Sequence, residues 1–542
     1  MKKEEQDNLS WSGFIHWAPK KILLSSLFYG SIRILFATAW PYLLYHYLQK
    51  RDFTFNAAAG QILAIIFLLF ILSALATHRQ SVLNIKLVDG FSHALYQKLW
   101  EKMLAIKWLS FHRKSRVYFI DIFMNEAWRL RKGITALLES IVVNLILVAA
   151  LMLLVFLSSK LMFLLCIFSL GISGALHLYS SYKLRPLVQH FHQAWRNQHH
   201  WSSTLTDQFD LLKMDRGHAF SRVQNENNTA AFLGSNSAML KDQSKWNSIN
   251  LLVNNLLRLL VFLLGMYWVQ QQQILFADFL FILLIVSMIQ TNLNQVPTAI
   301  YTSIESKEAS NRIREFFAMD TDLAAQNNIK PLPNIHSISI TDLRFAYSSQ
   351  NVVKNPAIHL QKGKLYLWQG ANGSGKSTTA HVLMGLLEPD SGNLTVNGAA
   401  CSWQELKAYQ HRFAFVHQEA PMFIGTLQEN ILFGHPEPAR AWQQLQHSWL
   451  HPLLPSGQNA ESRTIGEHGE GLSGGEARRL ALIREWLRDS ELIILDEPLN
   501  HLDEYSITEL RREIVNIKHN AIVIIISHQT GFETLADEIR RF

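Results

Sequence analysis

Long apolar stretches alternate with polar ones through roughly the first 300 residues of this 542-residue chain. Six of them are long enough for a helix that crosses a bilayer, which needs about 20 residues. They cover approximately residues 22–48, 58–78, 135–157, 160–180, 249–270 and 275–297. A stretch such as IVVNLILVAALMLLVFL (141–157) lacks the polar face that a helix of a soluble protein keeps. The pattern therefore predicts six membrane-spanning helices.

The connections between these stretches differ greatly in length. Those at 79–134 and 181–248 are long and repeat apolar residues at helical spacing. They contain 11 and 8 Lys and Arg residues, against 3 in all the short connections. Positive charge stays on the cytoplasmic side, so we expect both long connections and both termini there. The predicted domain is a six-helix bundle with two long cytoplasmic hairpins.

A second domain follows the polar segment AMDTDLAAQNNIKPLPN (318–334), which we interpret as a linker. Short alternating runs such as SISITDLRFAY and NLTVNG predict strands. ELIILDEP (491–498) and AIVIIISH (521–528) are apolar throughout, like strands buried on both faces of a parallel sheet. The predicted organisation is an all-α transmembrane domain over 1–317, the linker, and an α/β domain over 335–542.

Composition agrees with a membrane protein. The chain is 49% hydrophobic and 17% charged, below the roughly 25% charged residues of soluble domains. Its net charge of +7 comes from basic residues that flank apolar stretches rather than form one patch, so we expect no nucleic-acid partner. Two cysteines, Cys166 and Cys401, make no disulfide framework, and no Cys/His cluster has metal spacing. The charged N-terminus is not typical of a cleaved signal peptide.

A glycine-rich loop carries the first candidate chemistry. GANGSGKS (370–377) satisfies G-x-x-x-x-G-K-[ST] between a predicted strand and a predicted helix. Such a loop surrounds phosphates with backbone N–H groups, while Lys376 reaches the β- and γ-phosphates and Ser377 can bind Mg²⁺. The expected ATP-binding residues here are Gly370, Ala371, Asn372, Gly373, Ser374, Gly375, Lys376, Ser377 and Thr378.

Two acids end the buried strand ELIILDEP. Asp496 is placed to hold Mg²⁺, and Glu497 to orient or deprotonate an attacking water. The alternative is a solvated strand end. A phosphate loop 120 residues earlier favours the catalytic interpretation.

The motifs GANGSGKST, FAFVHQEAPMFIGTLQENILFG, LSGGE, LIILDEP and IISH follow one another in this order. In this the chain resembles an ABC transporter, specifically an exporter-type half-transporter with the membrane domain before the ATP-binding cassette. The resemblance covers essentially the whole chain and implies ATP hydrolysis with Mg²⁺ and two cassettes that enclose ATP. The sequence has Glu476 where exporters usually have Gln, and NHLD (500–503) instead of the usual SALD.

The resemblance implies further roles by position. The helices that couple the membrane domain to the cassette would lie near 118–128 and 209–219. Tyr347 would stack on adenine, Gln418 would sense Mg²⁺, and His528 would contact the γ-phosphate. The catalytic residues would be Lys376, Gln418, Glu497 and His528, and the Mg²⁺ ligands Ser377, Gln418 and Asp496. The residues that reach ATP on the opposite subunit would be Leu472, Ser473, Gly474, Gly475, Glu476 and Asp503.

Ionisable residues inside spans are costly and often functional. The candidates are Arg33, Glu139, His177 and Arg258, with Asn144 and Asn254 nearby. Arg33 and Arg258 are the substrate-path candidates; the alternative is that such residues are paired within the bundle or snorkel from span ends.

The sequence thus predicts a dimeric exporter of the inner (cytoplasmic) membrane that moves an unidentified lipid, peptide or small molecule. It leaves open a homodimer or a heterodimer, such as a thiol exporter for cytochrome assembly. A membrane-anchored regulatory ATPase without transport is another alternative. A soluble nucleic-acid-associated ATPase is disfavoured by the six spans.

Overall fold

A computed structural model describes residues 19–49, 57–136, 143–213, 215–293, 296–322, 333–347, 351–354, 357–446, 454, 462–500, 502–528 and 531–542. The chain divides into two compact units. The helical unit comprises Met1–Leu104 and Lys114–Met319. The cassette unit comprises Ala105–Arg113 and Asp320–Phe542, so it contains a short piece from the first hairpin.

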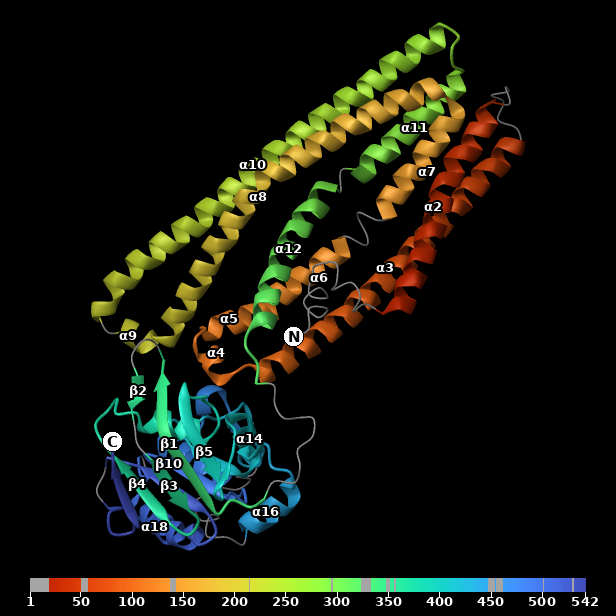
Figure 1. Ribbon diagram of the computed structural model, residues 1–542. Coiled ribbons are helices and arrows are strands. Elements are labelled where there is room, and N and C mark those ends of the chain that lie inside the picture. The colour runs from red at the N-terminus through yellow and green to blue at the C-terminus, as the bar shows by residue number, and fades with distance from the viewer. Residues whose placement is uncertain are drawn as a thin grey trace. The chain divides into compact units, whose positions relative to one another are not determined.

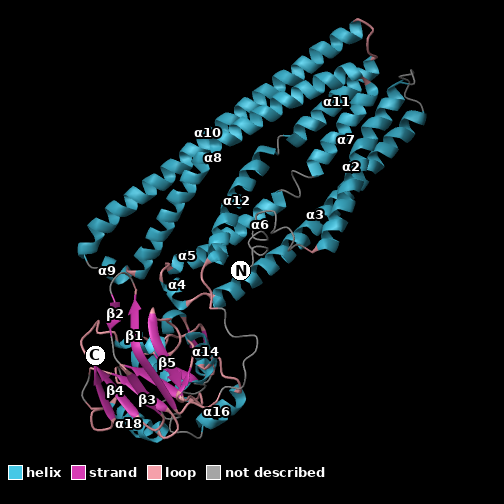
Figure 2. Cartoon of the chain, viewed as in Figure 1, coloured by secondary structure: helices cyan, strands magenta, loops and turns pink. Residues whose placement is uncertain are grey.

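The helical unit is built from helices, several of them long, as Figures 1 and 2 show. They are α2 (Lys20–Gln49), α3 (Ala57–Ala105), α5 (Arg116–Asp121), the π-helical turn η2 (Ile122–Glu126), α6 (Ala127–Ala136), α7 (Val143–Ser158), α8 (Lys160–Asp207), α9 (Phe209–Lys213), α10 (Asp215–Gln270), α11 (Phe276–Leu293) and α12 (Val296–Ala318). The prediction of an all-α first domain is confirmed.

Six apolar helices among the described residues coincide with the six predicted stretches. Four are long and apolar enough to cross a membrane: Lys20–Tyr47, Gly60–Ala105, Lys160–Asp207 and His218–Gln270. Asn144–Ser158 and Phe276–Asn292 are shorter apolar helices. Side chains such as Leu164 and Phe168 on α8 are exposed, 64% and 57%, which suits a surface that faces lipid.

The long connections of the sequence are continuations of the spans. Helices α3, α8 and α10 run for 49, 48 and 56 residues, or roughly 70–85 Å at 1.5 Å per residue. Figure 1 shows α8 and α10 packed side by side, with the short α9 at their turn. Helix α9 lies within the segment 209–219, where the resemblance implies a coupling helix, and that coupling role stays a prediction.

The first hairpin turns before the segment 118–128, where the resemblance implies a coupling helix, and that coupling role stays a prediction. The chain reverses at 106–115, around the five-residue helix α4 (Trp108–His112). Helix α3 ends at Ala105 because Ile106 forms a β-bridge with Thr321, and Ser115 caps the next helix by accepting a hydrogen bond from the Tyr118 backbone N–H. Residues 118–128 instead form continuous α- and π-helix.

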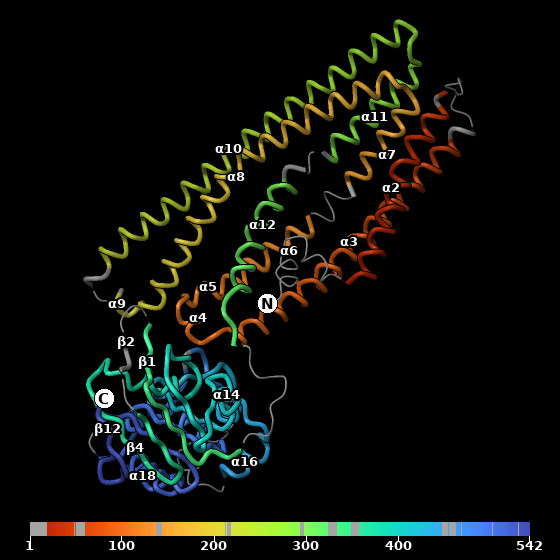
Figure 3. The backbone as a smooth tube through the Cα atoms, viewed as in Figure 1, coloured from red at the N-terminus to blue at the C-terminus, as the bar shows by residue number. Residues whose placement is uncertain are grey.

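The described part of the cassette unit contains three sheets, and Figure 3 traces the backbone that forms them. An antiparallel sheet has the order β2-β1-β5-β6, with β3 paired to β1; a parallel sheet has the order β12-β4-β11-β10-β7; and β8 pairs with β9. The strands are β1 (Ser337–Ala346), β2 (Asn351–Lys354), β3 (Ile358–Gln361), β4 (Leu365–Gln369), β5 (Ser391–Val396), β6 (Ala399–Ala400), β7 (Phe413–Val416), β8 (Gly425–Thr426), β9 (Thr464–Ile465), β10 (Leu492–Asp496), β11 (Ile522–Ile526) and β12 (Glu538–Arg541).

Helices cover these sheets and connect their strands. They are α13 (Lys376–Leu383), α14 (Trp403–Ala408), α15 (Leu427–Ile431), α16 (Pro438–Gln446), α17 (Gly474–Trp486) and α18 (Glu504–Lys518), with short 3₁₀ turns η4 (Gln410–Arg412) and η7 (Glu467–Gly469). The predicted α/β second domain is confirmed.

The register of the parallel sheet brings three strand ends together. Asp496 of β10 pairs with Ile526 of β11, and Ile526 pairs with Trp368 of β4. The carboxyl ends of parallel strands share one edge of the sheet, and ligands bind outside that edge in open α/β folds. The glycine-rich loop after β4 and the acids that end β10 therefore lie at the same edge.

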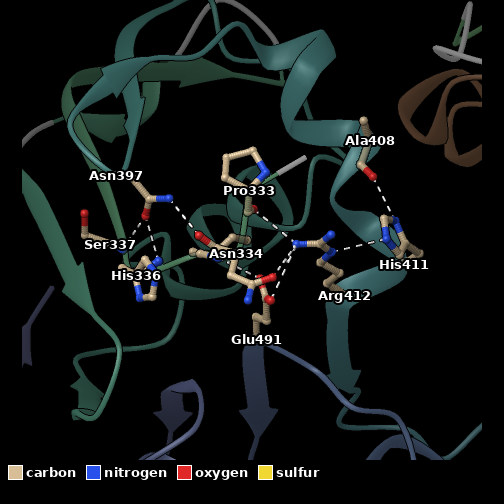
Figure 4. Close-up of polar contacts among 10 residues, drawn as sticks. Pro333, Asn334, His336, Ser337, Asn397, Ala408, His411, Arg412 and Glu491 are labelled. Atoms are coloured by element: carbon tan, nitrogen blue, oxygen red, sulfur yellow. Dashed lines mark hydrogen bonds and ion pairs between the residues drawn. The ribbon is translucent and has the colours of Figure 1, made fainter. Parts of the chain in front are cut away.

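The entry into the cassette core is fixed by hydrogen bonds (Figure 4). Asn397 adopts a left-handed φ of 54°, and its Oδ1 accepts from the backbone N–H groups of His336 and Ser337 at 2.7 and 3.1 Å. The Arg412 guanidinium donates to the Pro333 carbonyl at 3.1 Å and lies 3.5 Å from Glu491. Most of the predicted linker, 323–332, lies outside the described residues.

The piece from the first hairpin packs into the cassette core. Trp108 stacks on His112, with ring centroids 3.8 Å apart, and lies 4.8 Å from the ring of His381 on α13. Trp108 and Leu109 pack against the main hydrophobic core of the cassette. Burial, with smaller effects of neighbouring histidines, lowers the pKa of His381 to about 4, so this contact is made by a neutral imidazole at pH 7.

Candidate active site

The glycine-rich loop leads directly into helix α13. Gly375 stands before the helix at a φ of 98°, a left-handed conformation that suits glycine. The Lys376 side chain folds back into the loop, and its ammonium donates to the carbonyls of Gly370 and Ala371 at 2.8 and 3.0 Å. Lys376 is 6% exposed, and burial lowers its pKa while Asp496 and Glu497 oppose this shift.

A hydroxyl and a carboxylate meet beside this loop. Ser377 Oγ donates to Asp496 Oδ2 at 3.3 Å. Burial raises the pKa of Asp496, and the Ser377 hydrogen bond acts against it. Oxygen ligands of this kind, few in number and next to a phosphate loop, are what Mg²⁺ uses in nucleotide sites. The residues present therefore fit Mg²⁺, and Ser377 and Asp496 are the side chains that would hold it.

Glu497 is held in a defined orientation. Its backbone takes a left-handed φ of 48°, which is uncommon for a residue other than glycine and typical of functional sites. The carboxylate accepts from the backbone N–H of His528 at 3.0 Å and from Ser527 Oγ at 3.3 Å. Its own N–H donates to the Ile526 carbonyl at 2.8 Å. These contacts connect the acid to the end of β11.

A cavity of about 230 Å³ lies between these groups. Its lining includes these predicted nucleotide-site residues: Asn372, Gly373, Ser374, Gly375, Lys376, Ser377, Thr378, Gln418, Asp496, Glu497 and His528. Ile526, which was not predicted, lines it as well. Four segments that are distant in sequence thus meet around one space. Backbone donors, an ammonium, hydroxyls and two carboxylates surround it, the chemistry that a nucleotide triphosphate with a metal ion requires.

Tyr347 is placed differently. It directly follows β1, is 40% exposed, and meets Phe345 edge-on at 4.8 Å. Among the described residues it does not line the cavity, so its predicted stacking on adenine stays a prediction.

The signature residues lie on their own helix end. Ser473 caps α17 in a capping box, in which its Oγ accepts from the Glu476 N–H and the Glu476 carboxylate accepts from the Ser473 N–H. This backbone hydrogen bond lowers the pKa of Glu476. The Glu at this position therefore has a structural role that a Gln could share. Asp503 similarly caps α18, accepting from the Ser506 N–H at 2.7 Å.

Sequence reasoning missed Arg478, which is 2% exposed. Its guanidinium donates to the carbonyls of Asp496 and Glu497 at 2.6 and 2.8 Å and to the carbonyls of His417 and Gln418. One side chain on the signature helix thus holds the ends of β10 and β7. The only signal in the sequence was a basic residue two positions after Glu476.

The substrate-path candidates lie in the helical unit. Arg258 on α10 is half-buried and donates through Nε to Gln290 Oε1 on α11 at 2.7 Å, so it is paired within the bundle. Arg33 is half-buried on α2. Glu139 lies outside the described residues. His177 is 3% exposed, which excludes the snorkelling that its place near a span end suggested.

Comparison with known proteins identifies the cassette. The model of the ABC transporter family matches residues 353–500. Curated relatives include a "Probable ABC transporter ATP-binding/permease protein" of Haemophilus influenzae, 23% identical over 44% of this chain and 43% of that protein. An "ATP-dependent lipid A-core flippase" of Vibrio parahaemolyticus is 30% identical over 37% of this chain and 36% of its own length.

A third relative, the "Glutathione/L-cysteine transport system ATP-binding/permease protein CydC" of Bacillus subtilis, is 36% identical over 34% of this chain and 33% of that protein. The chain thus spans about a third to two fifths of these three relatives. A solved structure, "Structure of a bacterial Atm1-family ABC exporter with ATP bound", has a TM-score of 0.85 over 96% of this chain and 94% of that one, at 15% identity. This chain therefore has the fold of an ABC exporter, in which a helical domain with long apolar helices is fused to a C-terminal ABC transporter cassette.

Proposed function

We propose that the chain hydrolyses ATP and uses the energy to export a substrate across the cytoplasmic membrane, as one half of a dimer. The observation that carries the proposal is the cavity on which the glycine-rich loop, Asp496, Glu497 and His528 converge. Its residues match those expected of an ATP-hydrolysing cassette.

The roles of the residues follow from their contacts. Backbone N–H groups at the start of α13 would bind phosphate oxygens, helped by the positive end of the helix dipole. Lys376 would exchange its contacts with loop carbonyls for contacts with phosphate. Mg²⁺, when bound by Ser377 and Asp496, would neutralise charge on the phosphate oxygens. Glu497, oriented by His528 N–H and Ser527, would accept the proton of the attacking water.

A second chain is favoured by exposed apolar residues outside the spans. On α3, Tyr96, Trp100 and Leu104 are 38%, 58% and 71% exposed. On α5, η2 and α6, Ile120, Met124 and Trp128 are 54%, 66% and 47% exposed. In both sets the residues recur at every fourth position, which forms a ridge on one side of a helix. Exposed apolar ridges mark surfaces that a partner covers.

The printed names of the relatives give no single substrate. One refers to lipid A-core and another to glutathione and cysteine, and both matches cover less than two fifths of this chain. A heterodimer with a similar chain remains the alternative to a homodimer. A regulatory ATPase without transport is the second alternative.

Replacing Glu497 by Gln tests the catalytic proposal. The amide keeps an oxygen to accept from His528 N–H but cannot take up a proton, so kcat for Mg²⁺-dependent ATP hydrolysis should fall about 10²- to 10⁴-fold. The measurement is phosphate release by the purified full chain in lipid nanodiscs, beside binding of a fluorescent ATP analogue, which should persist.

The matched control is Glu437→Gln, an exposed acid beside α16, which should leave hydrolysis unchanged. Unaltered turnover in the Glu497→Gln protein would contradict the proposed base. If the wild-type chain binds ATP but shows no turnover alone, a second, different half-transporter is required.

A further inference from the structure

Helix α8 is polar on its buried side along the membrane span. Ser169, Ser173 and His177 are 8%, 3% and 3% exposed. On the opposite side, Ile167, Phe168 and Leu178 are 46%, 57% and 69% exposed. A helix that places apolar groups toward lipid and polar groups toward the protein interior is arranged for an interior polar function.

Helix α10 carries a matching row. Asn250 and Asn254 are 6% and 4% exposed and lie one turn apart. Two contacts fix the antiparallel register of the helices: Tyr179 meets Trp246 at 5.4 Å, and Met162 lies beside Gly265. This register places His177 level with Asn250, and Ser173 level with Asn254. We call the five residues Ser169, Ser173, His177, Asn250 and Asn254 the polar seam.

The polar seam contains buried groups with no hydrogen-bond partner. Within the part of the chain that the structure describes, this holds for Ser173 Oγ, both ring nitrogens of His177, and both side-chain polar atoms of Asn250. Small residues alone would suit close helix packing. Unpaired imidazole and carboxamide groups do not, because each loses hydrogen bonds that water would supply. These groups therefore call for a ligand that hydrogen-bonds.

A cavity lies beyond each end of the polar seam. At the Ser169 end, a cavity of about 10 Å³ is lined by Ser169 and Gln290 among others, which is roughly the space of one water. From His177, steps of four residues along α8 reach Arg185 and then Gln189. Both residues line a cavity of about 330 Å³ against α12. Hydrogen-bonding groups therefore extend along α8 between two cavities.

The chemistry of the seam selects its ligand. Hydroxyl, carboxamide and imidazole groups offer both donors and acceptors, and no Asp, Glu, Lys or Arg belongs to the seam. We propose that the polar seam holds a neutral hydrogen-bonding group, a hydroxyl or carboxamide of the exported molecule or the water that takes its place, along the transport route. The proposal rests on the proposed export function and adds the class of group that the route recognises.

The test uses one introduced thiol. In a chain with Cys166→Ala and Cys401→Ala, Ser173→Cys places a thiol in the polar seam with little change in size. The matched control is Ile172→Cys, at the adjacent, 36% exposed position on the apolar side. Methyl methanethiosulfonate reacts with the thiolate, which requires a hydrated site. In nanodiscs, with and without ATP and Mg²⁺, the Ser173→Cys protein should react at least tenfold faster than the Ile172→Cys protein.

Eight-carbon amphiphiles then test whether the neutral group belongs to a solute or is water. If the seam takes a hydroxyl or carboxamide of a solute, 1-octanol or octanamide should slow labelling of the Ser173→Cys protein severalfold, octyltrimethylammonium should not, and Asn250→Leu should abolish the protection. If water alone occupies the seam, fast labelling without protection by any of them is the expected result.

Equal labelling rates of the Ser173→Cys and Ile172→Cys proteins in every nucleotide state would overturn the proposal, as would equal protection by the cationic amphiphile. Labelling needs no ATP turnover and can be repeated in the Glu497→Gln protein. The labelling experiment can therefore contradict the proposal for the polar seam independently of the proposal that the chain hydrolyses ATP.

Discussion

At the scale of the residue, one buried guanidinium connects the strands that carry the nucleotide-site residues. Arg478 donates to the carbonyls of Asp496, Glu497 and Gln418, so it holds two strand ends at a fixed separation. Its burial lowers its pKa, opposed by the nearby acids, and the surrounding carbonyls stabilise the charged form. The position of Glu497 thus depends on a residue that need not touch the nucleotide.

Arg478→Met should therefore impair both stability and turnover. The variant leaves several buried carbonyls without their charged donor, which costs about 2–3 kcal/mol. For a domain of this size we expect the Tm to fall by about 4–12 °C and ATP hydrolysis to fall at least tenfold. Differential scanning fluorimetry and phosphate release measure the two effects.

Arg440→Met is the matched control for this variant. Its ion pair with Glu437 is 70% and 59% exposed, and such pairs contribute about 0–1 kcal/mol. If the Arg478→Met and Arg440→Met proteins show the same Tm and the same rate of ATP hydrolysis, Arg478 does not position the catalytic acid.

The sequence predicted local chemistry better than it predicted contacts. The residues from Asn372 to Thr378, with Asp496 and Glu497, could be found because a phosphate loop and a buried, acid-ended strand have fixed spacing and patterning. Arg478 and Asn250 could not be found, because their importance comes from carbonyls and helices distant in the chain. A polar residue's partners, or lack of them, are set only by packing.

At the scale of the element, the five-residue helix α4 is the clearest departure from the sequence prediction. Its apolar spacing continues that of α3, so periodicity alone extends the helix past Ala105. The backbone pairing of Ile106 and Lys107 with residues 320 and 321 ends it instead. The end of helix α3 is therefore set by a contact between segments distant in the sequence, which the local pattern of residues could not predict.

Trp108→Ala should release this element from the cassette. The indole packs on the cassette core and against His381, so its loss should increase hydrogen exchange of the 105–113 amides about tenfold or more, equivalent to about 1.4 kcal/mol of local stability. ATP hydrolysis should persist, because Trp108 is not among the described residues that line the nucleotide cavity. Hydrogen–deuterium exchange and turnover in nanodiscs and detergent measure these effects.

Trp403→Ala serves as the control, since Trp403 packs on the same core from helix α14. It removes an equal volume without touching the 105–113 segment. Similar exchange of that segment in both variants would contradict a specific role of Trp108.

At the scale of the whole molecule, the exposed ridges on α3 and on α5, η2 and α6 should form a dimer interface. A Trp100→Glu and Met124→Glu double variant would bury two unpaired charges in that interface. The purified chain should be dimeric by mass photometry, and the variant monomeric with reduced ATP turnover. Ile539→Glu, at a 43% exposed apolar residue of the cassette, controls for added charge. A variant that stays dimeric would place the interface elsewhere.

The piece 105–113 makes the cassette unit a discontinuous domain. A protein expressed from residue 320 onward would lack Trp108 and Leu109, which pack against its core, and would expose the apolar site that receives them. Such a fragment should be less stable and more prone to aggregate than the same domain in the full chain, and a peptide of residues 105–113 should rescue it by complementation. Truncation at the linker would therefore report the properties of an incomplete fold.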